Sequence, residues 1–331
     1  MSTSSPKADR AALSRLAAVE RVPLIGRSTP VEEMSRLRAA LGAGPRLLVK
    51  RDDAIPFAFG GNKTRKLELL AAEALAAGSD TLVTVGGIQS NHARATAATA
   101  AKLGLHCLLI ANGAKPAPPR ANALLDELLG AEIEYIPSRN ERASAMESAI
   151  RRLTREGRKP YAIPLGASTP LGALAFARAV GELLGQTEPP DVIIHATSSA
   201  GTQAGLVAGC ALNGLRTNVM GVSADDPADE IARTVRGLVA GVAALLGSTS
   251  DALGEAPVSV DAAFVGDGYG IPTPASLEAQ GLAARNEALF VDNTYTAKAL
   301  AALIAYVRAG RFRDRETVLF WHTGGQVGIF A

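Results

Sequence analysis

The stretch FAFGGNKTRKLELL (57–70) places a lysine where the chain is expected to turn. Two glycines and an asparagine precede Lys63, and an apolar helical pattern begins only after it. The simplest interpretation is a solvated residue at the entry to a helix. The alternative is a chemical role, because a lysine that is held at one point and partly desolvated has a lowered pKa and becomes a nucleophile.

The stretch SSAGTQAG (198–205) follows an apolar run and has the composition of an anion-binding turn. Small residues let the backbone approach a ligand, and the first turn of a helix offers free N–H groups and a positive potential. The hydroxyls of Ser198, Ser199 and Thr202 could add donors. The stretch suits one phosphate ester, since it has neither the lysine of a P-loop nor the G-x-G-x-x-G of a dinucleotide site. Taken alone, a plain strand–helix connection with a Ser or Thr cap explains it equally well.

Polar side chains also gather in VGGIQSNHAR (85–94), where Ser90, Asn91 and His92 stand at the start of a predicted helix. Their donors would suit a carboxylate. Helix capping alone also explains Ser and Asn at such a position, and without further context it is the better interpretation.

Three more residues lie in turn-rich polar sequence. Thr323 follows an apolar strand in HTGGQVG, and Tyr269 and Tyr295 lie in GDGYGIPTP and DNTYTAK. A tyrosine in such a setting usually packs with its hydroxyl hydrogen-bonded. The functional alternative is a phenol placed for proton transfer.

The rest of the sequence predicts strands that alternate with helices. Strands are expected at 46–53, 80–87, 105–112, 132–137, 159–164, 191–197, 218–225 and 316–325. Helices are expected from about 64, after 205, and over 92–104, 121–130, 141–157, 169–185, 230–247 and 296–310. This alternation is typical of a mainly parallel sheet covered on both faces. Ligands bind at the carboxyl ends of the strands in such sheets, which is where every cluster described above is expected.

Composition argues against several other classes of protein. The net charge is +2, with both signs interleaved, which gives no field for nucleic acid or an anionic membrane. Cys107 and Cys210 lie in apolar runs and the four histidines are scattered, so neither a disulfide nor a metal site is expected. The first residues lack the apolar segment of a signal peptide, and no apolar stretch is long enough to span a bilayer. A cytoplasmic protein is therefore expected.

These clusters together indicate one cofactor. They supply a turn-held lysine, a monophosphate cradle, a carboxylate cradle and isolated hydroxyls, without metal ligands or a dinucleotide fingerprint. This combination predicts pyridoxal 5′-phosphate bound to Lys63 as a Schiff base.

The chain resembles the family of D-cysteine desulfhydrases and 1-aminocyclopropane-1-carboxylate deaminases in five motifs that occur in order: GGNKTRKLE, VTVGGIQSNHAR, KPYAIPLGAS, SSAGTQAG and HTGG. The resemblance extends from about residue 28 onward. It implies an α/β protein of pyridoxal-phosphate fold type II, like the tryptophan synthase β-subunit, with mainly parallel twisted sheets and helices on both faces. It also implies a large cofactor-binding domain of residues 1–65 and 169–331, a small inserted α/β domain of residues 66–168, and a homodimer.

The resemblance further implies roles for individual residues. Lys63 matches the Schiff-base lysine, Asn91 the partner of the cofactor's phenolic oxygen, and Thr323 the residue that faces the pyridine nitrogen. The phosphate loop is matched by Ser199, Ala200, Gly201 and Thr202. The substrate-binding residues are matched by Ser90, Asn91, His92, Tyr295 and Thr296. The catalytic residues are matched by Lys63, Ser90, Tyr269 and Tyr295.

Three positions favour the desulfhydrase branch of this family. The deaminases carry Glu after the second tyrosine, Leu before the terminal Gly-Gly, and Gln at a third position, where this chain has Thr296, Thr323 and His92. A neutral hydroxyl near the ring nitrogen makes the cofactor a weaker electron sink, which suffices for β-elimination with a good leaving group. The predicted reaction converts D-cysteine to pyruvate, hydrogen sulfide and ammonia. Either Lys63 or a relay through Ser90 and Tyr295 would remove the α-proton, and Tyr269 would protonate the leaving group.

Other functions stay open at this point. Within the enzymes, the chain could be a 1-aminocyclopropane-1-carboxylate deaminase, an L-cysteate sulfo-lyase, or a lyase or racemase of another D-amino acid. The loop 111–122 is expected on the substrate side without indicating which. A non-catalytic cofactor-binding protein is disfavoured because the lysine and both tyrosines are present. A nicotinamide oxidoreductase is disfavoured because no glycine-rich turn completes its fingerprint.

Overall fold

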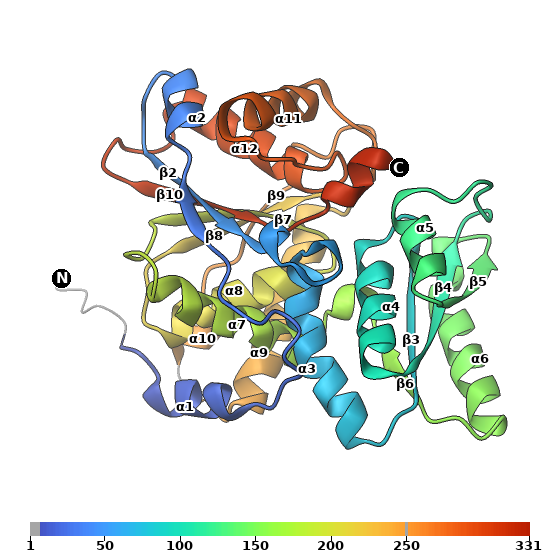
Figure 1. Cartoon of the computed structure of the whole chain (residues 1–331). Helices are drawn as coiled ribbons and strands as arrows, with labels where there is room; N and C mark the ends of the chain where they lie inside the picture. The colour runs from blue at the N-terminus through green and yellow to red at the C-terminus, as the bar shows by residue number, and fades with distance from the viewer. Residues whose placement is uncertain (1–6, 249–250) are drawn as a thin grey trace.

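The structure is a computed structural model that describes residues 7–248 and 251–331. It contains a six-stranded sheet and a four-stranded sheet, each covered by helices on both faces (Figure 1). The predicted α/β class with mainly parallel sheets is confirmed. Among the described helices, none is long and apolar enough to cross a membrane.

The large sheet has the strand order β1-β2-β10-β7-β8-β9. Its strands are β1 (Val31–Glu33), β2 (Arg46–Arg51), β7 (Val192–Thr197), β8 (Asn218–Ser223), β9 (Ser259–Asp261) and β10 (Thr317–His322). All neighbours pair in parallel except β1, which runs antiparallel to β2 at the edge. The central strands β7 and β10 are largely apolar and buried because both of their faces are covered.

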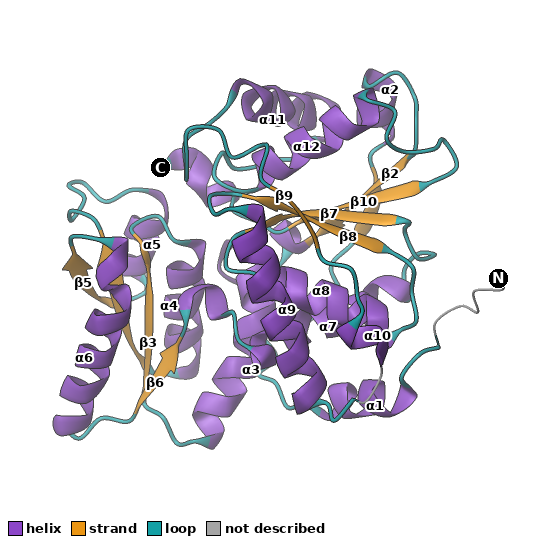
Figure 2. Ribbon diagram, turned by 180° about the vertical axis from the view of Figure 1, so that it is seen from behind, coloured by secondary structure: helices purple, strands orange, loops and turns teal. Residues whose placement is uncertain are grey.

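Two layers of helices enclose the large sheet (Figure 2). One face packs against α1 (Arg10–Ala18), α7 (Pro170–Leu184), α8 (Gly201–Leu212), α9 (Ala228–Leu245) and α10 (Asp251–Gly254). The other face packs against α2 (Ser35–Ala40), α11 (Pro274–Glu287) and α12 (Thr296–Arg308). Alternate residues of β10 point into the two cores: Leu319 and Trp321 face the first layer, and Val318 and Phe320 face the second.

The small sheet is entirely parallel and has the order β5-β4-β3-β6. Its strands are β3 (Thr81–Gly87), β4 (His106–Asn112), β5 (Glu132–Ile136) and β6 (Pro160–Ile163). Its helices are α4 (Asn91–Leu103), α5 (Ala121–Leu128) and α6 (Arg142–Arg155), with α4 and α6 on opposite faces. The whole sheet lies within residues 66–168, and the domain limits given above stay a prediction.

Helix α3 (Asn62–Ala76) joins the two sheets. It leaves the large sheet after β2 and packs against both α7 and α4 (Figure 1). Its first turn therefore lies where the two halves of the molecule meet, and this turn carries Lys63.

Some elements were not expected from the sequence. Strand β1 has only three residues, too few to show an alternating pattern. Helix α11 begins with a capping box in which Thr273 and Ser276 exchange hydrogen bonds, followed by Pro at the first position. Its small and polar residues give it almost no apolar stripe, so periodicity did not reveal it.

Candidate active site

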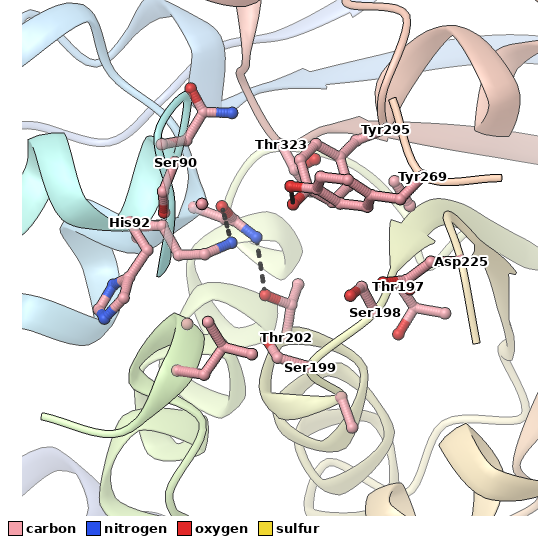
Figure 3. A pocket seen from close by; sticks show the side chains of 18 of the residues that line it. Ser90, His92, Thr197, Ser198, Ser199, Thr202, Asp225, Tyr269, Tyr295 and Thr323 are labelled. Carbon is pink, nitrogen blue, oxygen red and sulfur yellow. Dashed lines mark hydrogen bonds between the residues drawn. The ribbon is translucent and has the colours of Figure 1, made fainter. Parts of the chain in front are cut away.

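A cavity of about 290 Å³ lies between the two sheets, at the carboxyl ends of β3, β4, β7, β8 and β10 (Figure 3). It brings together ten of the predicted site residues: Lys63, Ser90, Asn91, His92, Ser199, Ala200, Thr202, Tyr269, Tyr295 and Thr323. Gly201 and Thr296 do not line it. The clusters are therefore parts of one site, as the strand-end rule predicted.

The turn before Lys63 depends on two glycines with positive φ, Gly60 at 67° and Gly61 at 101°. A Cβ on Gly60 would lie 2.6 Å from the carbonyl oxygen of Asp53, so no other residue fits. The backbone N–H of Gly61 donates to the carbonyl of Asp52 at 2.8 Å. These contacts fix the point at which α3 begins, and with it the root of the Lys63 side chain.

The Lys63 amine is linked to the loop before α8 by a chain of side chains. Its Nζ donates to Asn62 Oδ1 at 3.0 Å, and Asn62 Nδ2 donates to Thr202 Oγ1 at 2.9 Å. Asn62 is itself held by its backbone N–H, which donates to the carbonyl of Thr323 at 2.9 Å. The lysine and the proposed phosphate loop therefore lie within reach of one small molecule.

Burial lowers the pKa of Lys63 to about 8. The carboxylate of Asp292 opposes this shift, and the positive charge of Arg94 adds to it. Since an amine with this pKa is partly unprotonated near neutral pH, Lys63 can act as a nucleophile and as a base.

The loop before α8 forms a tight cradle around the start of that helix. Ala200 is its N-cap and has a left-handed backbone, with φ 66°. Ser168 Oγ hydrogen-bonds Ser199 Oγ at 2.9 Å and accepts from the N–H of Gly201 at 3.2 Å. A Cβ on Gly166 would lie 2.2 Å from Ser199 Oγ. Glycine is therefore required at positions 166 and 201, and the N–H groups and hydroxyls of small residues are left to face an anion.

Lys66 is a second lysine at this cradle and was not assigned a role from the sequence. Its Nζ donates to the carbonyl of Gly166 at 3.1 Å and to Ser168 Oγ at 3.3 Å. Burial, and then the charge of Lys63, hold the pKa of Lys66 well below its usual range. The i, i+3 spacing of the two lysines on one helix was the available signal.

The N-terminus of α4 carries Ser90, Asn91 and His92. Ser90 Oγ caps the helix by accepting from the N–H of Ala93 at 3.2 Å. Asn91 Oδ1 accepts from Asn122 Nδ2 at 3.0 Å. This terminus presents polar groups to the cavity, as expected for a carboxylate site.

The ring of His92 is directed elsewhere. Its Nε2 hydrogen-bonds Thr84 Oγ1 at 2.8 Å, and Figure 3 shows the ring turned away from the tyrosines. Burial, and then the charges of Lys63 and Lys66, hold the pKa of His92 well below its usual range, so the ring is neutral. Only the backbone of His92 is then available to a substrate, whereas the sequence-based prediction made no distinction between backbone and ring.

The two predicted tyrosines meet at one wall of the cavity (Figure 3). The hydroxyls of Tyr269 and Tyr295 hydrogen-bond each other, and their rings form an edge-to-face pair with centroids 5.7 Å apart. Burial raises the pKa of both phenols, so both are neutral hydrogen donors near neutral pH.

Asp292 holds the end of α12 that carries Tyr295. Its carboxylate accepts from the backbone N–H of Tyr295 at 3.0 Å and from the hydroxyl of Thr296 at 2.7 Å. Thr296 is fully buried. Its hydroxyl supports Tyr295 through this carboxylate, and its predicted contact with substrate stays a prediction.

Several charged residues at the mouth of the cavity were not predicted: Arg139 from the 3-10 turn Arg139–Glu141, Arg142 from the start of α6, and Asp225 and Asp226 after β8. Arg139 lies 3.4 Å from Asp226 and 4.0 Å from Asp225. Of residues 111–122, all of which are described, Asn112 is the one that lines the cavity. Within the described chain no three His, Cys, Asp or Glu side chains are grouped to hold a metal ion.

A family model described as pyridoxal-phosphate dependent enzyme matches residues 22–324. The chain belongs to this family. D-cysteine desulfhydrases of Yersinia enterocolitica and Klebsiella pneumoniae are each 38% identical to it, over 325 and 330 residues. Those alignments cover 96% of this chain and 97% and 98% of the relatives.

Two solved structures share the fold of this chain. The crystal structure of a homologue of ACC deaminase has a TM-score of 0.90 and 33% identity, covering 97% of this chain and 96% of that one. The processed form of threonine deaminase isoform 2 from Solanum lycopersicum has a TM-score of 0.69 and 15% identity, and it shows the fold alone. That match covers 97% of this chain and 86% of the other. Fold type II and the dependence on pyridoxal phosphate are thus confirmed.

The residues present fit this cofactor. Its aldehyde requires an amine that is not fully protonated, which Lys63 supplies. Its phosphate requires N–H groups and hydroxyls without bulky side chains, which the cradle at Ser199 and Gly201 supplies. Thr197 Oγ1 lines the cavity, is buried, and has no hydrogen-bond partner among the described residues, so a ligand would satisfy it.

Proposed function

We propose that the protein is a lyase that eliminates hydrogen sulfide from D-cysteine, with pyruvate and ammonia as the other products. The observation that carries this proposal is the Lys63–Asn62–Thr202 chain, which joins a reactive amine to a phosphate cradle beside a pair of neutral phenols. The names of the relatives that are 38% identical support the choice of substrate.

The cofactor, when bound, supplies an electron sink for the negative charge that develops at the substrate α-carbon. Lys63 is the amine that would hold its aldehyde. Ser199, Ala200, Gly201 and Thr202 would hold the phosphate, with Lys66 behind them. Asn91 and Thr323, which both line the cavity, would contact the ring.

The other residues would orient the substrate and move protons. Ser90 and the first N–H groups of α4 suit the substrate carboxylate, because they combine hydrogen donors with a positive helix end. Lys63, once released, can take the α-proton because its pKa of about 8 leaves it partly unprotonated. The Tyr269–Tyr295 pair, neutral at this pH, can give a proton to the departing sulfur. A base role for Ser90 with Tyr295 is the alternative.

A second candidate is 1-aminocyclopropane-1-carboxylate deaminase, since a homologue of that enzyme superposes at a TM-score of 0.90. The neutral Thr323, which lines the cavity, favours elimination over opening of an unactivated ring. L-Cysteate sulfo-lyase and lyase or racemase of another D-amino acid stay as further alternatives.

A substrate panel tests the proposal. Purified holoenzyme is mixed with D-cysteine, L-cysteine, β-chloroalanine, cysteate and the cyclopropane amino acid, and pyruvate, 2-oxobutanoate and sulfide are measured. Pyruvate and sulfide from D-cysteine are expected. Absence of turnover with D-cysteine, while the cofactor spectrum is intact, would exclude this substrate.

We also propose a cytoplasmic homodimer. The assembly is supported by the family resemblance, and the compartment is the one expected from the composition of the sequence. Sedimentation velocity tests the first statement and cell fractionation the second.

A further inference from the structure

Arg142 lines the same cavity as Lys63 and has no part in the chemistry proposed above. It is the first residue of α6 and is half-buried. Its Nε and Nη2 both donate to Asn112 Oδ1, at 2.9 Å for Nε. Since Asn112 ends β4, the guanidinium is fixed to the wall of the cavity by a neutral amide.

No carboxylate of the described chain lies within 4.0 Å of this guanidinium, although two acids, Asp225 and Asp226, lie at the cavity mouth. Both acids form ion pairs with the neighbouring Arg139 instead, at 3.4 Å for Asp226 and 4.0 Å for Asp225. Asp225 is also hydrogen-bonded by Ser198. Arg142 therefore has no carboxylate in ion-pair contact, although the charge of Asp225 acts on it from a longer distance. Its Nη1 makes no hydrogen bond to a described residue.

The position of Arg142 is unfavourable for the helix that carries it. Cations destabilise a helix N-terminus, where the dipole is positive, and acids are favoured there. The first turn of α6 contains no acid. Helix stability thus gives no reason for an arginine at this point, and a local rule broken at the edge of a cavity is typical of a functional residue.

Arg142 also lies on the tyrosine side of the cavity. Burial, and then the charge of Arg139, lower the pKa of Arg142, whereas Tyr269, Tyr295 and Asp225 act in the opposite direction. The carboxylate end of a substrate is assigned above to Ser90 and the N-terminus of α4. The β-substituent, which must reach the phenols, is then the part of the substrate nearest Arg142.

We infer that Arg142 is a specificity-determining residue that binds a negatively charged β-substituent of the amino-acid substrate, so that the substrate class of this site includes β-sulfonated amino acids such as cysteate. The inference rests on the proposed function for the placement of the substrate. Guanidinium groups bind oxyanions through paired N–H donors. A guanidinium that is already held in place loses little conformational entropy when the ligand binds. Elimination from cysteate is balanced as cysteate plus water giving pyruvate, ammonium and bisulfite.

The test compares wild-type holoenzyme with Arg142→Gln, which removes the charge but keeps a hydrogen donor. Arg142→Lys restores a charge without the paired donors. Arg151→Gln is the matched control, because Arg151 lies on the same helix, exposed and paired only with groups of that helix. Thermal unfolding checks that each variant is folded.

Two readouts separate the possible outcomes. Calorimetry measures the Kd of each cysteate enantiomer and of alanine, which lacks the β-substituent. Turnover measures kcat/KM for cysteate and for β-chloroalanine, whose substituent is uncharged. Arg142→Gln is expected to weaken cysteate binding and kcat/KM about 10- to 100-fold, the size of one charged hydrogen bond. Alanine and β-chloroalanine should change less than about threefold, Arg142→Lys should recover part of the loss, and Arg151→Gln should behave as wild type.

Equal effects of Arg142→Gln on cysteate and alanine, or no effect on either, would overturn the inference, and turnover of D-cysteine would then still support the proposed function. Conversely, cysteate binding that depends on Arg142, without pyruvate from any substrate, would support the anion site and refute the lyase.

Discussion

The side-chain amide of Asn62 donates a hydrogen bond of 2.9 Å to the hydroxyl of Thr202. Its oxygen accepts at the same time from Lys63. One buried side chain thus spans the cofactor site from the amine to the phosphate cradle. It fixes the separation of the two groups that a single cofactor molecule must bridge.

Replacing Asn62 by Ala should therefore loosen the cofactor. We expect cofactor affinity to fall about 5- to 100-fold, because one net hydrogen bond is lost on each side of the amide. Fluorescence titration of the apoenzyme with pyridoxal phosphate measures this. Asn213→Ala is the control, since Asn213 bonds only within the end of α8. Unchanged affinity in Asn62→Ala would show that the amide plays no part in the site.

The lowered pKa of Lys63 makes its reaction with aldehydes pH-dependent. The unprotonated amine is the reactive form, so the rate of cofactor attachment should rise with pH and level off above about 8. Stopped-flow absorbance at a series of pH values gives this profile. Borohydride reduction and peptide mapping should label Lys63, and Lys63→Ala should take up no label. A label on Lys66 would contradict the assignment.

Loss of a phenol should impair turnover more than binding. Tyr295→Phe removes one hydroxyl of the pair, and kcat for D-cysteine should fall about 100-fold or more while cofactor affinity stays the same. Because the pKa of both phenols is raised, no loss of activity from their ionisation is expected below about pH 10. Steady-state kinetics across pH check both statements. Tyr161→Phe, on the outer edge of the small sheet, should leave kcat unaltered.

A buried ion pair behind the Lys63 turn should control stability. Asp52 is fully buried and accepts from Arg65 Nη2 at 2.7 Å and from Trp321 Nε1 at 2.8 Å. Asp52→Ala would leave the Arg65 guanidinium buried beside fewer acceptors, so the free energy of unfolding should fall by about 3–5 kcal/mol. Urea unfolding measures this, and the exposed Asp229→Ala should change it by less than about 0.5 kcal/mol.

Acid should weaken the same cluster through Glu182. Hydrogen bonds from Arg65 and Lys50 lower the pKa of Glu182 to about 2, against the opposing effect of burial. A lowered pKa in the folded state means that stabilisation is present above the ordinary value of 4.5 and is lost as pH falls toward 2. Urea unfolding between these pH values should show this loss in the wild type and a shallower dependence in Glu182→Gln. Parallel curves for the two proteins would refute the linkage.

The sequence was informative where a residue's role depends on its immediate neighbours. The turn at Lys63 was predictable because its glycines adjoin the lysine, and the strands were predictable because buried parallel strands are long apolar runs. Arg142 was not predictable as a site residue, because an arginine at the start of a charged helix is usually exposed to solvent. Its side chain is held at the cavity by a hydrogen bond to Asn112 on β4, and only the three-dimensional structure shows that the two residues meet. The direction of the His92 ring is likewise set by its hydrogen bond to Thr84 on β3. The position of His92 at a helix N-terminus does not indicate this partner.

Strand β10 is the last strand in chain order, yet it lies between β2 and β7 in the middle of the large sheet. Thr323 then closes the site by accepting from the backbone of Asn62. During synthesis on a ribosome, β2 and β7 therefore stay unpaired on their facing edges until β10 is made. The cofactor site is complete only after β10 has left the ribosome and inserted into the sheet. A chain that ends before β10 would therefore be unable to bind the cofactor.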